Sequence, residues 1–188
     1  MIWHDRKIVF IHIPKCGGTS VRKAIQKKVG GTHRNRTWLH GWKVLDGDIW
    51  NQHATYDQYS LTVPKDYMYI AQVRNPFDRW ESLYFYYIRH HGLTSDFNQW
   101  TQLQISPRLQ GNLQSMLKPY MWVTQYYFIP PDCEVHRLED KTIWNVLGKT
   151  EVHRNKSRRQ PIEWTEESRQ LVRDYFKCDF KEFGYDIT

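Results

Sequence analysis

The chain has 188 residues, which predicts one compact domain over residues 1–188 rather than two. Hydrophobic residues make up 40% and charged residues 25%, so the chain can bury a core and wholesale disorder is excluded. The formal charge of +7 favours an anionic partner, which leaves nucleic acid, a phosphorylated cofactor and an acidic polysaccharide open.

Each of the first two predicted strands is followed by a predicted helix. Ile8–Ile13 is a β-branched run that stops at Pro14, and Tyr67–Val73 is a second run closed by a proline-containing turn. Short apolar runs with such boundaries are typical of buried strands. The apolar spacing then becomes helical, first from Thr19 and later from Trp80. The two helical faces consist of Val21, Ala24, Ile25, Lys28 and Val29, and of Trp80, Leu83, Tyr84, Tyr87 and His91.

The second half of the chain continues this alternation. Asp96–Leu103 and parts of Leu113–Phe128 have helical spacing, with Pro107 and Pro119 as expected interruptions. The remaining predicted elements are a strand over Cys133–Leu138, a helix over Asp140–Leu147, and a helix that Thr165 caps, with Leu171, Val172, Tyr175 and Phe176 as its apolar stripe. Strands alternating with helices predict an α/β fold, a P-loop-like three-layer domain with a mainly parallel sheet between helices.

A phosphate-binding loop is predicted between the first strand and the first helix. Two glycines, Gly17 and Gly18, let the backbone approach an anion, and the N-terminus of the helix presents unpaired N–H groups. Thr19 and Ser20 add hydroxyl donors, and Lys15 adds a positive charge. An ordinary P-loop has its lysine after the last glycine, whereas this lysine precedes the pair. The alternative is a plain glycine-containing turn between a strand and a helix.

A second anion site is predicted where the second strand leads into a helix. Arg74 follows that strand, and Ser82 lies about two helical turns further on, so both side chains could reach one phosphate. The alternative for Arg74 is a surface salt bridge with Asp78 or Glu81. For Arg79 a surface salt bridge is the favoured interpretation.

These two segments resemble a known family. Phe10–Ser20 is similar to the 5′-phosphosulfate loop of carbohydrate sulfotransferases that use 3′-phosphoadenosine 5′-phosphosulfate (PAPS), the group that includes the heparan sulfate 2-O-sulfotransferases. Val73–Ser82 matches the pattern Val-Arg-x-Pro-x-x-Arg-x-x-Ser of that family. The resemblance implies that Lys15 contacts the bridging oxygen and 5′-phosphate, and that Arg74 and Ser82 bind the 3′-phosphate. The other residues implied to hold the 5′-phosphate end are Cys16, Gly17, Gly18, Thr19 and Ser20.

Sulfuryl transfer requires a base for the acceptor hydroxyl and a cation for the leaving phosphate. Lys15 can supply the cation, and no bound metal is expected, because a sulfuryl group carries less charge than a phosphoryl group. His53 is the chosen base, since it lies between the two donor-binding segments and His53-Ala-Thr resembles a family motif. His33 and His40 are the reserve candidates, and His12 is interpreted as a core residue of the first strand.

The C-terminal third extends the resemblance. Lys156 and Arg158 lie where the family has a loop closing over the nucleotide, and the alternative there is a solvated basic run. The acidic-aromatic segment Asp174–Tyr185 resembles the family's C-terminal end, and its aromatic residues are expected to pack against the core.

The predicted function is transfer of the sulfuryl group of PAPS to a hydroxyl of a carbohydrate-like acceptor, with 3′-phosphoadenosine 5′-phosphate as product. A P-loop-type kinase or other nucleotide-binding protein is the nearest alternative, but the position of Lys15 and the lack of an acidic metal ligand after a strand disfavour it. A basic nucleic-acid-binding module lacks its usual signatures. A related fold without catalysis is the last alternative.

Compartment and source are predicted from what the sequence lacks. Ile8–Ile13 is too short for the apolar region of a signal peptide, and no segment approaches a membrane span. Three widely spaced cysteines without a CxxC pair give neither a disulfide framework nor a zinc site. A cytoplasmic enzyme of bacterial or viral origin, with no membrane or nucleic-acid partner, is therefore expected.

Overall fold

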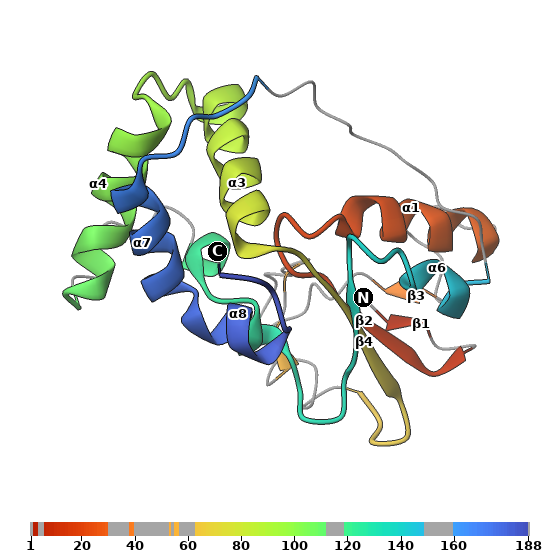
Figure 1. Ribbon diagram of the computed structural model, residues 1–188. Helices are drawn as coiled ribbons and strands as arrows, with labels where there is room; N and C mark the ends of the chain where they lie inside the picture. Colours follow the sequence, from red (N-terminus) through yellow and green to blue (C-terminus); the bar gives the residue numbers. More distant parts are fainter. Residues whose placement is uncertain are drawn as a thin grey trace, which may run out of the picture. The chain divides into compact units, whose positions relative to one another are not determined.

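The computed structural model describes residues 2–3, 6–29, 38–39, 53, 55–56, 63–111, 119–148 and 160–187. The chain divides into two compact units (Figure 1): unit 1 comprises Met1–Val73 and Gln125–Asn155, and unit 2 comprises Arg74–Thr124 and Lys156–Thr188. Neither unit is a continuous stretch of chain, and the single domain stays a prediction. Within the ranges given above, no helix has both the length and the apolar character needed to cross a membrane.

Unit 1 is built on one sheet, and the described strands have the order β3-β1-β2-β4-β5. Neighbouring strands β2, β4 and β5 run parallel, whereas β1 is antiparallel to both β2 and β3. The sheet is thus parallel on the side that leads to the predicted loop and mixed on the other. The strands are β1 (Ile2–Trp3), β2 (Ile8–Ile11), β3 (Trp38–Leu39), β4 (Met68–Val73) and β5 (Glu134–Arg137).

The predicted strands are confirmed, with shorter bounds. β2 ends at Ile11 rather than Ile13, and β4 begins one residue after Tyr67. All four side chains of β2 are buried, as expected for a strand without a solvent face. The short β1 and β3 were not predicted, because two-residue strands carry no periodicity.

Helices α1 (Gly18–Val29) and α6 (Ile143–Val146) lie on the same face of this sheet (Figure 1). The predicted α1 face is confirmed for Val21, Ala24 and Ile25, which are at most 3% exposed. They pack with residues of β1, β2, β4 and α6: Trp3, Ile8, Phe10, Ile70, Ile143, Trp144 and Leu147. Each fully buried aliphatic or aromatic side chain contributes about 1.5–3 kcal/mol to folding.

Unit 2 is helical in its described part, and Figure 1 shows α3, α4 and α7 side by side. Trp80 is at the centre of an aromatic core, with ring centroids 4.7 Å from Trp100, 5.5 Å from Trp122 and 5.7 Å from Phe176. The indole Nε1 of Trp80 donates to Thr101 Oγ1 at 2.9 Å, so its polar atom is satisfied inside the core. The helices of this unit are α3 (Pro76–His91), α4 (Phe97–Leu109), α5 (Pro119–Trp122), α7 (Glu166–Tyr175) and α8 (Lys177–Glu182).

The start of α3 follows from three adjacent residues. Asn75 caps the helix, because its side chain accepts from the N–H of Phe77 at 2.9 Å, and Pro76 occupies the first turn, where no N–H is needed. Arg74 thus stands between the last residue of β4 and the helix cap. On the predicted stripe of α3, Trp80, Leu83, Tyr84 and Tyr87 are buried, whereas His91 is exposed at the C-terminus.

The predicted interruption at Pro107 is wrong. Pro107 lies within α4, which runs to Leu109 after the Asp96 cap. The missing hydrogen bond of the proline is tolerated because it falls in the last turn of the helix. Pro119 instead begins the short α5, and 3-10 helix η2 (Tyr126–Phe128) follows in unit 1.

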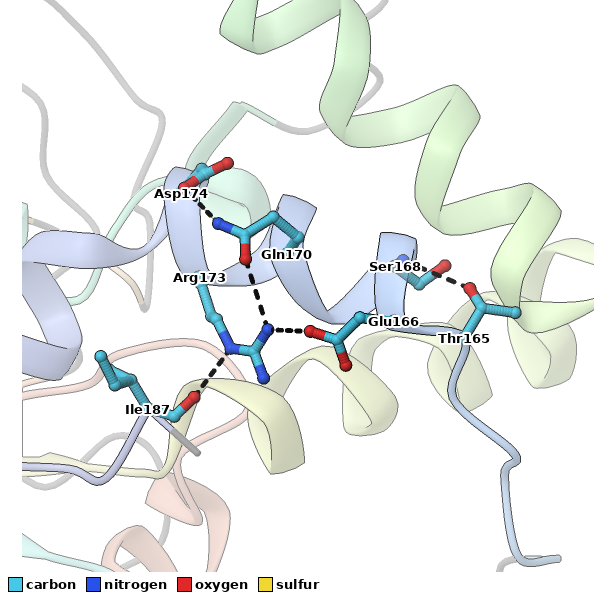
Figure 2. Close-up of polar contacts among 7 residues, drawn as sticks. All are labelled: Thr165, Glu166, Ser168, Gln170, Arg173, Asp174 and Ile187. Atoms are coloured by element: carbon cyan, nitrogen blue, oxygen red, sulfur yellow. Dashed lines mark hydrogen bonds and ion pairs between the residues drawn. The ribbon is translucent and has the colours of Figure 1, made fainter.

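The Thr165 cap of α7 is confirmed (Figure 2). Thr165 Oγ1 accepts from the N–H of Ser168 at 3.2 Å, and Glu166 and Glu167 lie in the positive first turn. Near the other end, Arg173 donates to Glu166 Oε1 at 2.5 Å and to the backbone oxygen of Ile187 at 2.7 Å. These contacts tie the C-terminal segment to α7.

Thr165→Ala is expected to lower the free energy of unfolding by about 1 kcal/mol, because the Ser168 N–H loses its acceptor. Urea denaturation measures the change, with Thr94→Ala, at an exposed position outside the helices, as the control. A Thr165→Ser variant keeps the hydroxyl and should retain most of the stability. Equal losses in Thr165→Ser and Thr165→Ala would contradict the capping role.

Candidate functional site

The loop that connects β2 to α1 has the backbone geometry of an anion-binding turn. Lys15 and Gly17 both have positive φ, 67° and 76°, and Cys16 between them does not. Alternation of this kind turns successive N–H groups toward one side. In the part of the chain that the structure describes, the N–H groups of Gly17, Gly18 and Thr19 make no hydrogen bond, whereas that of Ser20 donates to Gly17 O at 2.9 Å.

The left-handed conformation of Lys15 is informative in itself. A residue with a Cβ is strained at φ 67°, and such strain is concentrated at functional sites. The Lys15 side chain is half-buried at the start of a helix of 12 residues, where the helix dipole also favours an anion. Lys15, Gly17, Gly18 and Thr19 thus contribute charge and donors to one short segment.

Side chains beneath the loop explain why two glycines are needed there. A Cβ on Gly18 would overlap the His12 imidazole, and a Cβ on Gly17 would lie 2.9 Å from Leu138 Cδ1 and 3.4 Å from Gln72 Nε2. Both glycines were predicted to let the backbone approach an anion closely. The structure adds that the His12 ring excludes a side chain at Gly18, whereas at Gly17 the positive φ of 76° disfavours one.

Cys16 belongs to the loop through its backbone. Its side chain is 1% exposed, and the thiol donates to Gln125 Oε1 at 3.0 Å. Gln125 is fully buried just before η2, so this contact ties the loop to another segment of unit 1. The thiol therefore faces the protein interior.

His53 and His12 lie against each other in unit 1. Their ring centroids are 4.5 Å apart, and His53 Nδ1 lies 2.6 Å from the backbone oxygen of His12. Because a carbonyl oxygen only accepts, Nδ1 of His53 carries the proton, and in the neutral ring Nε2 carries the lone pair. This is the arrangement that a general base requires.

The burial predicted for His12 is confirmed, and the prediction that it lies inside the first strand is wrong. His12 follows β2 instead of lying within it, and it is 4% exposed. It orients His53 through its carbonyl and supports Gly18 with its ring. Sequence reasoning missed this role because burial of a histidine next to a strand says nothing about its neighbours.

The structure describes three further histidines besides this pair. His90 and His91 are exposed at the end of α3 in unit 2. His136 in β5 is buried, which lowers its pKa although Glu134 opposes the shift, and its Nδ1 lies 2.9 Å from Thr142 Oγ1. The reserve candidates His33 and His40 lie outside the described residues, as do Lys156 and Arg158.

Arg74 and Ser82 belong to unit 2, one immediately before α3 and the other within it. Arg74 Nη2 lies 3.7 Å from Asp78 Oδ2, a distance longer than a hydrogen bond. The salt bridge considered as the alternative for Arg74 is thus present in loose form with Asp78. Glu81, the other proposed partner, instead accepts from Trp164 Nε1 at 2.9 Å. Ser82 is 8% exposed.

The prediction of a surface salt bridge for Arg79 is wrong. Arg79 is 3% exposed, and its Nη2 donates to the backbone oxygens of Val123 at 3.0 Å and Met121 at 3.4 Å. Its guanidinium also lies 5.6 Å from the ring centroid of Phe176. Arg79 therefore connects α3 to the segment after α5.

A family comparison decides the class of the protein. The model of the sulfotransferase family matches residues 1–186. The chain belongs to the sulfotransferase family. No curated protein and no solved structure matches the chain.

As a member of the sulfotransferase family, the chain is a transferase of sulfuryl groups. The family generally uses PAPS as donor and an acceptor that bears a hydroxyl. The sulfotransferase match spans both units, including the β2–α1 loop, His53 and the Arg74–Ser82 segment. Among the residues with a described placement, no three His, Cys, Asp or Glu side chains form a group that could hold a metal ion.

Proposed function

We propose that this sulfotransferase transfers the sulfuryl group of PAPS to a hydroxyl of a carbohydrate acceptor by in-line displacement. The observation that supports this most is the β2–α1 loop, with Lys15 in a left-handed conformation and three successive N–H groups without partners among the described residues. Such a loop suits a phosphate or sulfate group better than an uncharged ligand.

In this proposal the loop binds the 5′-phosphosulfate end of the donor. Lys15 contacts the bridging oxygen and stabilises the charge that develops on the leaving phosphate. The N–H groups from Gly17 to Thr19 and the hydroxyls of Thr19 and Ser20 hold the phosphate. Cys16 is proposed as a further contact of this end of the donor, although its thiol donates to Gln125 Oε1 and its N–H to Ile13 O at 3.4 Å.

Arg74 and Ser82 are proposed to bind the 3′-phosphate. Both residues lie in unit 2, Arg74 between β4 and α3 and Ser82 on α3, which supports a joint role. Lys156 and Arg158 are proposed to add charge around the same phosphate. No metal ion takes part in the proposed chemistry.

His53 is proposed as the base. Its Nε2 accepts the proton of the acceptor hydroxyl as the new S–O bond forms and the bond to the donor phosphate breaks. The His12 carbonyl supports this role, because it fixes the tautomer that places the lone pair on Nε2. A buried histidine held in this way needs no rearrangement before the proton transfer.

The donor assignment is tested by calorimetric titration with 3′-phosphoadenosine 5′-phosphate, with AMP and with ATP plus magnesium. We expect the bisphosphate to bind without metal, and Lys15→Ala and Arg74→Ala each to weaken it about 10- to 100-fold, as loss of a charged hydrogen bond does. Arg89→Ala, an exposed residue near the end of α3, is the control.

The same titration contains the contradicting outcomes. Binding of ATP with magnesium in preference to the bisphosphate would contradict the proposed donor and favour a kinase instead. Equal affinity for AMP and the bisphosphate would mean that the 3′-phosphate is not bound, and would contradict the role proposed for Arg74 and Ser82.

A further inference from the structure

Gln72 is a polar residue on the face of β4 that packs against α1, a face that is otherwise apolar at Ile70. Ile70, two residues earlier on that face, is fully buried in the core, and Gln72 is itself only 2% exposed. Its Oε1 is completely covered and has no hydrogen-bond partner among the described residues, whereas Nε2 is not one of the fully covered atoms without a partner. A buried amide oxygen without a partner is costly, and such groups in folded proteins call for a bound ligand, ion or water as an explanation.

The position of this amide relates it to the β2–α1 loop. Gln72 Nε2 lies 3.4 Å from the point that a Cβ on Gly17 would occupy, so the amide lies directly against the loop. Gly17 is one of the three residues whose N–H groups have no partner among the described residues. Across the sheet Gln72 pairs with His136, whose lowered pKa keeps it uncharged near neutral pH.

We propose that Gln72 is a further anion-contacting residue of the donor site, with its Nε2 donating to a non-bridging oxygen of the phosphosulfate group. This inference rests on the proposed function. A neutral donor adds a hydrogen bond to the anion without changing the net charge of the site. The amide keeps both of its protons, and the bonds that form and break remain those of the sulfuryl transfer.

Two variants of similar size separate this role from packing. Gln72→Leu removes the donor and fills the same apolar surroundings, and Gln72→Glu keeps the shape but replaces the donor by a negative charge. We expect kcat/KM for PAPS to fall about 10- to 100-fold in Gln72→Leu, and further in Gln72→Glu because the carboxylate repels the donor. The melting temperature of Gln72→Leu should not fall, because leucine removes an unpaired buried amide oxygen.

Gln99→Leu, at an exposed position on α4, is the control for the chemical change itself. Activity of Gln72→Leu within about twofold of the unmodified protein would overturn the proposal. Full activity in Gln72→Glu would also overturn it, since that side chain can only accept a hydrogen bond and would then be positioning the loop.

Failure of this inference differs from failure of the proposed function. If the unmodified protein binds no 3′-phosphoadenosine 5′-phosphate, the donor assignment itself is wrong. If the unmodified protein binds the bisphosphate and turns over PAPS while both Gln72 variants behave like it, only the role of Gln72 is wrong.

Discussion

Replacement of His53 by alanine is expected to lower kcat about 10²- to 10⁴-fold, the range that a general base contributes. The Kd for 3′-phosphoadenosine 5′-phosphate should change by less than about twofold, because the base acts on the acceptor hydroxyl and not on the donor. Single-turnover kinetics with PAPS and calorimetry with the bisphosphate measure the two effects separately.

His53→Asn separates catalysis from structure. The asparagine amide can still donate to the His12 carbonyl, the bond that holds His53 in place at 2.6 Å, but it has no basic nitrogen. We therefore expect His53→Asn to fold like the unmodified protein and to be as inactive as His53→Ala. His90→Ala, an exposed histidine of α3, is the matched control and should leave kcat unchanged. Activity in His53→Asn would exclude His53 as the base and direct attention to His33 and His40.

Gly18→Ala is the second substitution with a large expected effect. The added Cβ would overlap the His12 imidazole, which is 4% exposed beneath the loop and cannot move into solvent without exposing the core. We expect a loss of about 3 kcal/mol in the free energy of unfolding and loss of bisphosphate binding, because the first turn of α1 must shift. Urea denaturation and calorimetry measure the two quantities.

A double substitution tests whether overlap with the His12 ring causes the loss of stability expected in Gly18→Ala. Gly18→Ala combined with His12→Ala should recover most of the stability lost in Gly18→Ala, since alanine at the start of α1 is otherwise a better helix former than glycine. Gly92→Ala is a useful comparison: its φ is 64°, but an added Cβ meets nothing within 4 Å, so the expected cost is about 1 kcal/mol from the backbone alone. If the double variant is no more stable than Gly18→Ala, the backbone of the β2–α1 loop, and not the His12 ring, requires glycine at this position.

The elements of the fold were largely predictable where a periodic pattern was long enough. The helical stripe that begins at Trp80 and the cap at Thr165 were both identified correctly, because side-chain spacing and capping are local properties. The extension of α4 through Pro107 was missed, since tolerance of a proline depends on its place in the last turn. The two-residue strands β1 and β3 depend on pairing partners distant in the sequence.

In the candidate site, too, local patterns were predicted from the sequence and contacts between distant residues were not. Lys15, the glycine pair and Arg74 stood out because lysine, glycine and arginine at the ends of strands are a local pattern for phosphate. Arg79 was misjudged, because only the structure shows that backbone oxygens of Val123 and Met121 surround a buried guanidinium. The contacts of His12 and Gln72 with the glycine pair were not predicted.

The sequence by itself indicated a phosphate- or sulfate-binding loop, because the strand, the glycine-containing loop and the helix follow one another directly in the chain. Only the tertiary structure decided what lies beneath and beside that loop. Gln72 of β4 against Gly17 and the His12 carbonyl that orients His53 join residues far apart in the chain, and the His12 ring lies against Gly18 of the following helix. Such contacts arise when a sheet forms and side chains on one face become neighbours, and no local spacing of residues encodes them.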